Sequence, residues 1–234
     1  IHTLIKLITK GNKMTRYYWC DDKTKEKIEE TSHDESGVTP IILMGASEGQ
    51  GPVDSCVDIS DNTIMFYGEV SERNAKFLNK AIRMLDKDLQ VFKVKYDSNP
   101  PPIKLHINSY GGSIFAGLST VDVILNCKTP VHSYIDGSAA SAATLISVVA
   151  DKRFIYQNSH MLIHQLTSSM WGKFEDFKDE MENLDMLMTK IKNIYKKSTT
   201  MSTRQITEIL KRDKWFDAEK CVELGLVDEI VENG

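Results

Sequence analysis

A serine set among small residues is the first candidate for chemistry in this sequence. Ser141 lies in the run GSAASAA, residues 137–143, between a predicted strand and a predicted helix. Small neighbours permit a sharp turn and the close approach of a substrate. The free N–H groups at the start of a helix suit an oxyanion. The same residues would also suit tight helix packing, and the run is not the G-x-S-x-G pattern of α/β-hydrolases, so Ser141 is a candidate nucleophile only.

Histidines supply the candidate general base. His164 ends the apolar run MLIHQ, where an imidazole could exchange a proton near neutral pH. A histidine at the end of a buried strand is also commonly a hydrogen-bonded core residue. His160 precedes the same predicted strand and is the main competitor. The remaining histidines have weaker contexts, near the N-terminus or within predicted strands: His2, His33, His106 and His132.

Two further segments could complete a site. Asp213 lies in KRDKWF, where flanking bases and aromatic residues could keep its carboxylate ionised. The alternative is a surface acid at a helix end. The segment NSYGG, residues 108–112, ends a predicted strand with a glycine pair that could present backbone N–H groups to an anion. An ordinary turn would explain it equally well.

Alternating strands and helices would position these residues. We expect strands over 63–67, 103–107, 131–135, 153–156 and 161–163. We expect helices over 72–85, 114–126, 140–149, 203–212 and 217–224. The alternation predicts right-handed βαβ units and a mostly parallel sheet.

A longer helix is expected from about residue 174 to 195. Its apolar residues recur every three or four positions, as in an amphipathic helix of about 22 residues, roughly 33 Å long. All six prolines lie at or before Pro130, so none interrupts it. It could lie across the core or project as an arm toward another subunit.

The chain divides into an N-terminal extension, residues 1–56, and a domain over 57–234. The extension is expected to be partly disordered. Residues 21–35 carry seven acids against three lysines, and GASEGQGP, residues 45–52, is typical of a flexible linker. A solvated tail and a partner-docking segment are both compatible with this composition.

Composition excludes several classes of protein. The net charge of −4 shows no basic excess for nucleic acid, and no apolar stretch is long enough to span a membrane. The four cysteines are dispersed without a C-x-x-C pair, which argues against a zinc site and a disulfide framework. We therefore expect a cytoplasmic protein. A cysteine nucleophile would have no supporting local pattern.

The joint order of the motifs is more specific than any one of them. A glycine turn followed by Ser141, His164 and Asp213 resembles the ClpP family of caseinolytic serine peptidases. The matching motifs are NSYGGSIFAGL, GSAASA, KRF with NSHMLIHQ, and RDKWFDAEKCVELGLVDEI, over residues 57–232. The resemblance implies an α/β fold of the ClpP/crotonase type, with stacked βαβ units and a helix–strand handle near 173–196.

The resemblance also implies a role for each site residue. Ser141 would be the nucleophile, His164 the general base and Asp213 the group that orients the imidazole. The backbone N–H groups of Gly112 and Ala142 would form the oxyanion hole. The activity would be serine endopeptidase cleavage of unfolded polypeptides by acyl transfer.

Family members assemble as two stacked heptameric rings that enclose their active sites. The resemblance therefore implies a homo-oligomer and an AAA+ unfoldase of Clp type as partner. The peptidase itself would need no metal and no cofactor, and ATP would be used by the partner ATPase.

Several departures from the family pattern keep alternatives open. Tyr110 stands where proline is usual, Lys211 replaces a common acid, and residues 166–169 read LTSS rather than Pro-Leu-Gly-Gly. The loop over 89–102 is expected to be longer than usual. The alternatives are a ClpP-fold maturation peptidase of the phage head type, a catalytically weak structural ring subunit, and a crotonase-type acyl-CoA enzyme. The complete Ser–His–Asp set argues against the last two.

Overall fold

Strands and helices alternate along most of the described chain. The computed structural model describes residues 2–8, 15–21 and 56–232. The strands are β1 His2–Ile8, β2 Thr15–Asp21, β3 Val57–Ser60, β4 Thr63–Tyr67, β5 Ile103–Ser109, β6 Val131–Ala140, β7 Lys152–Tyr156, β8 His160–Leu162, β9 Trp215–Phe216 and β10 Glu229–Val231. The helices are α2 Glu72–Tyr96, α3 Ile114–Leu125, α4 Ala142–Val148, α5 Phe174–Ser198, α6 Thr203–Leu210 and α7 Ala218–Glu223.

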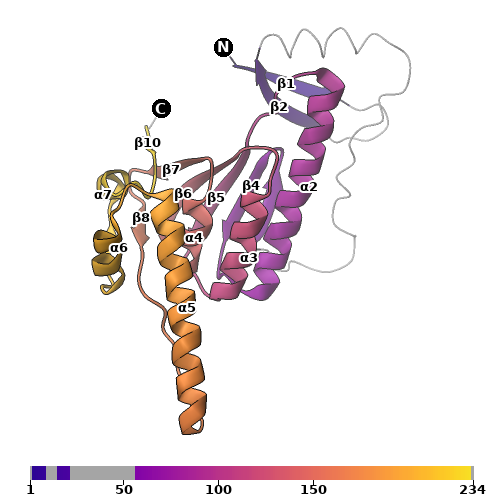
Figure 1. Ribbon diagram of the computed structural model, residues 1–234. Helices are drawn as coiled ribbons and strands as arrows, with labels where there is room; N and C mark the ends of the chain where they lie inside the picture. Colours follow the sequence, from indigo (N-terminus) through magenta and orange to yellow (C-terminus); the bar gives the residue numbers. More distant parts are fainter. Residues whose placement is uncertain (1, 9–14, 22–55, 233–234) are drawn as a thin grey trace.

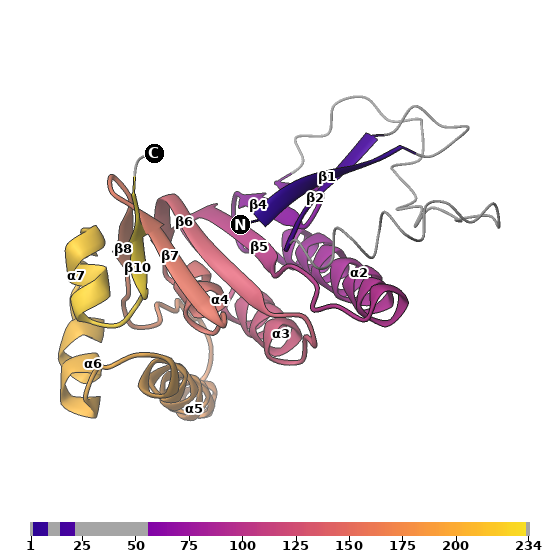
Figure 2. The same ribbon diagram turned by 90° about the horizontal axis from the view of Figure 1, so that it is seen from above.

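The main sheet is mostly parallel, as the sequence predicts. Its strand order is β10-β7-β6-β5-β4-β3, and β8 branches from the end of β6 to pair with β9. Within this sheet, as described, the β3–β4 and β8–β9 pairs are antiparallel. Helices α2, α3 and α4 lie side by side along one face of the sheet (Figure 2). The carboxyl ends of β5 and β6 therefore lead into adjacent turns, which is where the candidate residues fall.

Helix α2 is longer than the sequence predicted. Ser71 caps it by accepting a hydrogen bond from the N–H of Asn74, as expected, but the helix ends at Tyr96 rather than near residue 85. The prediction of a long loop over 89–102 was therefore wrong. The apolar stripe continues through Leu89 and Phe92, which are buried, and this packing stabilises the added turns.

Strand β6 also continues past its predicted end. It runs through Gly137 to Ala140, because residues 138–140 pair with β8. Helix α4 consequently starts at Ala142 instead of Ala140. The turn from strand to helix is thus confined to Ser141.

Helix α5 projects from the domain as an arm (Figure 1). It has 25 residues, and its buried side chains, Leu187, Ile191 and Tyr195, all lie in its second half. Of the two placements that the sequence left open, the arm is the one observed.

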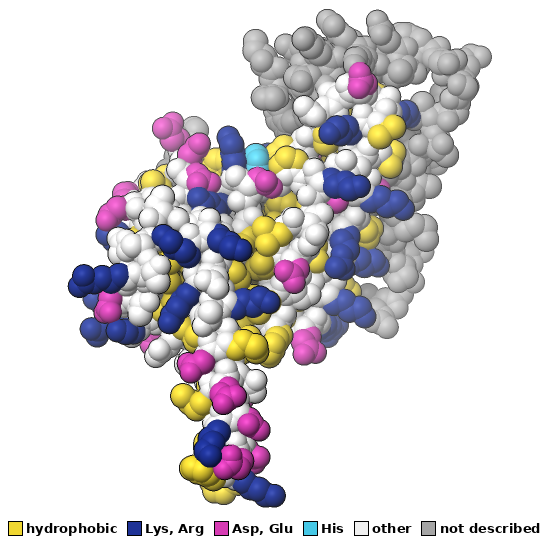
Figure 3. Space-filling model, viewed as in Figure 1, with side chains coloured by type: hydrophobic (Ala, Val, Ile, Leu, Met, Phe, Trp, Pro, Cys, Tyr) yellow, Lys and Arg dark blue, Asp and Glu magenta, His cyan; other side chains and the backbone are white. Residues whose placement is uncertain are grey.

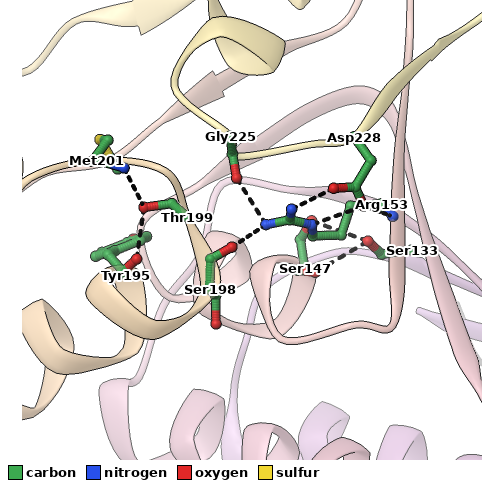
Figure 4. Close-up of polar contacts among 9 residues, drawn as sticks. All are labelled: Ser133, Ser147, Arg153, Tyr195, Ser198, Thr199, Met201, Gly225 and Asp228. Atoms are coloured by element: carbon green, nitrogen blue, oxygen red, sulfur yellow. Dashed lines mark hydrogen bonds and ion pairs between the residues drawn. The ribbon is translucent and has the colours of Figure 1, made fainter.

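Arg153 fixes the base of this arm (Figure 4). Its guanidinium donates to the carbonyl oxygens of Ser198 and Gly225 and forms an ion pair with Asp228 at 2.5 Å. Burial raises the pKa of Asp228, but the hydrogen bonds and charge of Arg153 outweigh it, so the pKa lies below its ordinary value. The end of α5 is therefore tied to the segment between α7 and β10.

The N-terminal region contains two strands that the sequence analysis did not anticipate. β1 and β2 pair antiparallel, with His2 opposite Asp21 and Ile8 opposite Thr15. The acidic run, apart from Asp21, and the linker GASEGQGP lie outside the described residues. Within the described part of the chain, no helix has both the length and the apolar composition needed to cross a membrane.

Candidate active site

Ser141 occupies a backbone conformation that is uncommon for a residue with a side chain. Its φ is 55° and its ψ is −127°, between the end of β6 and the start of α4. Such conformations cost free energy and persist where the surrounding structure enforces them, commonly at functional sites. Here the N–H of Ser141 donates to the carbonyl of Leu162 in β8 at 2.9 Å. The strand pairing therefore holds the serine at the turn.

A second anchor connects Ser141 to the base of α5. The carbonyl of Ser141 accepts hydrogen bonds from the N–H of Thr144 at 3.0 Å and from its Oγ1 at 2.6 Å. Thr144 Oγ1 also lies 2.6 Å from the hydroxyl of Tyr195. Burial raises the pKa of Tyr195, which keeps the hydroxyl protonated and able to donate. Strand β8 and helix α4 thus bond directly to the backbone of the candidate nucleophile, and α5 is connected to it through Thr144.

His164 and Asp213 lie within ion-pairing distance of each other. The imidazole Nδ1 lies 3.2 Å from the Asp213 carboxylate. In β8 and β9, Met161 pairs with Phe216 and Leu162 with Trp215. Continuing this antiparallel register by two residues sets His164 opposite Asp213. The two strands therefore bring together residues that are far apart in the sequence.

The third member of the set is Ser141. Among the described residues, no hydrogen bond joins Ser141 Oγ to His164. With Nδ1 directed to Asp213, the opposite ring nitrogen Nε2 remains available for the serine. Nucleophile and base often come into hydrogen-bonding distance only with substrate bound.

His160, the competing candidate base, has a different partner. Its Nδ1 lies 3.2 Å from the carbonyl of Asn158, and its side chain is exposed. It forms no ion pair with Asp213 in the described structure. The geometry thus favours His164 over His160.

The glycine turn lies against Ser141. A Cβ on Gly111 would be 2.7 Å from Ser141 Cβ and 3.0 Å from the N–H nitrogen of Ala142, and its φ is +92°, so only glycine fits there. Gly112 forms an isolated parallel β-bridge with Val70. The carbonyl of Val70 accepts a hydrogen bond from the N–H of Ser113, and the N–H of Val70 donates to the carbonyl of Gly111. In a parallel bridge of this kind, the N–H of Gly112 points away from Val70. Gly112 thus follows the glycine that packs on Ser141, and Ala142 follows Ser141 itself.

A second His–Asp pair is present that the sequence analysis did not single out. His106 Nδ1 lies 2.8 Å from Asp136, and the Tyr67 hydroxyl donates to the same carboxylate oxygen at 2.6 Å. Burial and the Asp136 carboxylate raise the pKa of Tyr67 to about 12. His106 is opposite Tyr134 in the β5–β6 register. Tyr134 lies seven residues before Ser141, which corresponds to about 23 Å along an extended strand. This pair is too far away to act on Ser141.

Two of the cysteines, Cys127 and Cys221, have raised pKa values and offer no competing nucleophile. Burial raises the pKa of Cys127 to about 11 and that of Cys221 to about 12, so both are protonated thiols at neutral pH. Over residues 56–232 and the two N-terminal strands, no group of three or more His, Cys, Asp or Glu side chains is placed to hold a metal ion.

A serine at a strand-to-helix turn, a His–Asp pair and nearby backbone donors are the arrangement of a serine hydrolase. The family model of the Clp protease matches residues 53–234. The chain therefore belongs to the Clp protease family, whose members are serine-type peptidases, and the predicted family and α/β fold class are confirmed.

Individual relatives agree with this assignment. The chain is 31% identical over 199 residues to the ATP-dependent Clp protease proteolytic subunit of Streptococcus mutans, covering 83% of this chain and 97% of that protein. It is 32% identical over 171 residues to ATP-dependent Clp protease proteolytic subunit 2 of Treponema pallidum, covering 72% and 81%. The structure of a ClpP1 mutant from Listeria monocytogenes superposes with a TM-score of 0.63 at 29% identity, covering 74% of this chain and 92% of that one.

Proposed function

We propose that this chain is the proteolytic subunit of an ATP-dependent protease, in which Ser141, His164 and Asp213 cleave unfolded polypeptides. The observation that carries the proposal is the approach of His164 Nδ1 to the Asp213 carboxylate at 3.2 Å, in a structure that holds Ser141 at φ 55°. Family membership supports the reaction class, and this geometry supports the proposed roles of the three residues.

The reaction would proceed by acyl transfer. Ser141 Oγ attacks the peptide carbonyl carbon while His164 Nε2 takes the hydroxyl proton, and Asp213 stabilises the imidazolium that forms. The N–H groups of Gly112 and Ala142 would stabilise the oxyanion. His164 then gives its proton to the leaving amine, and the C–N bond breaks. Water, activated by the same histidine, hydrolyses the acyl-enzyme and releases the serine. No step needs a metal or cofactor in the peptidase.

Assembly would follow from the projecting helix. The first half of α5 and the residues just before it expose large apolar side chains, which Figure 3 shows at the end of the arm: Trp171, Phe174, Phe177 and Met181. We propose that this arm joins two heptameric rings into a cytoplasmic chamber. An AAA+ unfoldase of Clp type would use ATP to deliver unfolded substrates.

The catalytic assignment can be tested with a fluorophosphonate probe. We expect one adduct, at Ser141, in the assembled protein. Ser141→Ala should abolish labelling and lower peptide cleavage by at least about 10⁴-fold, because it removes the attacking oxygen. Ser60→Ala, which changes an exposed serine at the end of β3, is the matched control. It should retain both probe labelling and peptide cleavage. Labelling at another serine would contradict the assignment.

The partner proposal has a separate test. Degradation of a stably folded protein should require an added AAA+ ATPase and ATP, whereas cleavage of short peptides should not. Degradation of the folded protein by the peptidase alone would argue against an unfoldase-dependent function.

A further inference from the structure

Cationic side chains line an open groove on α2. The groove has a volume of about 610 Å³ and lies between the second half of α2 and the residues that connect α3 to β6. We call it the α2 groove. Its lining includes four exposed cations: Arg83, Lys87, Lys95 and Lys128. Figure 3 shows Lys and Arg side chains following one another along α2, so the groove belongs to a basic face of this helix.

The positive charge of the α2 groove is largely uncompensated within the described structure. In the described lining, the four cations stand against a single acid, Asp86. That carboxylate is already hydrogen-bonded, because its Oδ1 accepts from the backbone N–H groups of Lys128 at 3.2 Å and Thr129 at 2.8 Å. Among the described residues, none of the four cations forms a salt bridge. The groove therefore carries an excess of positive charge, in a chain whose net charge is −4.

Aliphatic side chains accompany these cations. Val91 is 47% exposed and Val94 is 85% exposed, and both line the groove. They are three residues apart on α2 and therefore share one helix face. A ligand gains free energy by covering them, which an entirely polar ligand such as a phosphate would not do. The groove therefore fits an acidic peptide that carries an aliphatic residue.

The acidic run at residues 21–35 has this composition. Its sequence, DDKTKEKIEETSHDE, contains seven acids against three lysines, and Ile28 lies among three glutamates. Apart from Asp21, which ends β2, the run is outside the described residues. Its net negative charge and its aliphatic residue make it complementary to the α2 groove.

The chain is long enough to bring the acidic run to the groove. It is described again from Cys56, whose carbonyl accepts a hydrogen bond from the N–H of Tyr67, shortly before α2 begins. The twenty residues over 36–55 can span up to about 70 Å. Helix α2, with 25 residues, is only about 37 Å long. The connection therefore allows the run to reach the groove in the same chain.

We propose that the acidic run binds in the α2 groove of its own chain, with its carboxylates against the cations and Ile28 over Val91 and Val94. Exposed ion pairs are individually weak, but a flexible tether holds the run at an effective concentration in roughly the millimolar range. Salt screens such pairs, so the contact weakens as ionic strength rises. The groove contains none of the proposed catalytic residues, so this inference goes beyond the proposed function and does not depend on it.

Carbodiimide cross-linking of the full chain, mapped by mass spectrometry, tests the contact. The reagent joins a carboxylate and a lysine amine within ion-pairing distance into an amide and takes up the water released. We expect cross-links from the acidic run to lysines of the groove, with a yield that falls severalfold between about 50 mM and about 500 mM salt. Arg83→Glu, which reverses a groove charge without removing an amine, should lower this yield about fivefold. Arg204→Glu, at an exposed arginine on α6, is the matched control and should leave the yield unchanged.

The contrary outcomes are distinct. The exposed pair Lys178–Glu175, 3.0 Å apart on α5, shows in the same sample that the reagent has reacted. With that cross-link present, the absence of any from the acidic run to the groove would overturn the proposal, as would a yield that neither salt nor Arg83→Glu changes. Protein assembled from an equimolar mixture of unlabelled and ¹⁵N-labelled chains identifies the source of the run. Cross-links that join the two labels would assign it to a neighbouring copy and overturn binding within the chain.

Discussion

At the scale of single residues, the site is organised by backbone contacts more than by side-chain burial. Ser141 is fixed through its own N–H and carbonyl, which bond to Leu162 and Thr144. Asp213, in contrast, is 80% exposed and is placed by the register of β8 and β9. A solvated carboxylate adds little to the free energy of folding, so its role in the ion pair would be to orient His164.

Asp213→Asn should therefore impair catalysis and leave the fold intact. An asparagine amide can donate to Nδ1, which would put the imidazole proton on Nε2 and prevent it from accepting the serine proton. We expect kcat for peptide cleavage to fall about 10³-fold to 10⁴-fold, with an unchanged circular dichroism spectrum.

The control for this substitution is Glu208→Gln. Glu208 is an exposed acid on α6 that pairs with Lys211 at 2.9 Å, close to Asp213 in the sequence. It should retain full activity. Wild-type kcat in Asp213→Asn would mean that the ion pair does not orient the base.

At the scale of elements, the base of α5 supports the nucleophile turn. The hydroxyl of Tyr195 lies 2.6 Å from Thr144 Oγ1, and this group also donates to the carbonyl of Ser141. The long helix that carries the exposed arm is thus joined by hydrogen bonds to the start of α4. The positions of arm and site are coupled through buried contacts.

Tyr195→Phe tests this connection. Removing the buried hydroxyl should lower the free energy of unfolding by about 1 kcal/mol, because one hydrogen bond is lost while Thr144 keeps its bond to Ser141. Urea denaturation at matched protein concentration would measure it. Tyr134→Phe is the control, since the Tyr134 hydroxyl makes no hydrogen bond within the described residues; an equal effect of both changes would argue against the connection.

The elements themselves were largely predictable, and the misses have local causes. Periodicity placed β4, α3 and α5 to within a few residues. It ended α2 too early, because the turns beyond Leu85 alternate charged residues with only a few buried ones, such as Leu89 and Phe92. It ended β6 too early, because Gly137 interrupts the apolar pattern although its N–H is held by Ser159 Oγ at 2.7 Å.

The site was predicted as a set of residues but not as a geometry. The order of Ser141, His164 and Asp213 pointed to them, yet nothing local in the sequence pairs residue 164 with residue 213. That pairing depends on the short strand β9, which has two residues and no periodic signal. The close packing of Gly111 on Ser141 likewise depends on the adjacent ends of β5 and β6.

At the scale of the whole molecule, the projecting half of α5 carries an exposed apolar stripe formed by Phe174, Phe177 and Met181. Phe174 is 73% exposed and Met181 is 59% exposed, whereas Ile191 and Tyr195, on the same stripe nearer the domain, are buried. Exposed stripes of this length on an arm are typical of contacts between subunits. The stripe is therefore the surface on which the proposed pairing of rings depends.

Phe177→Glu combined with Met181→Glu should separate the rings. Both side chains lie on the apolar stripe, and burying carboxylates against an apolar partner would cost more than the contact provides. Sedimentation should show the mass of the assembly fall to about half, as expected for one ring of a C2-related pair. Asp179→Lys changes charge on the opposite face of the same helix turns and should leave the mass unaltered. A double-Glu variant that keeps the wild-type mass would show that the arm does not join the rings, and a wild-type monomer would remove the ring proposal itself.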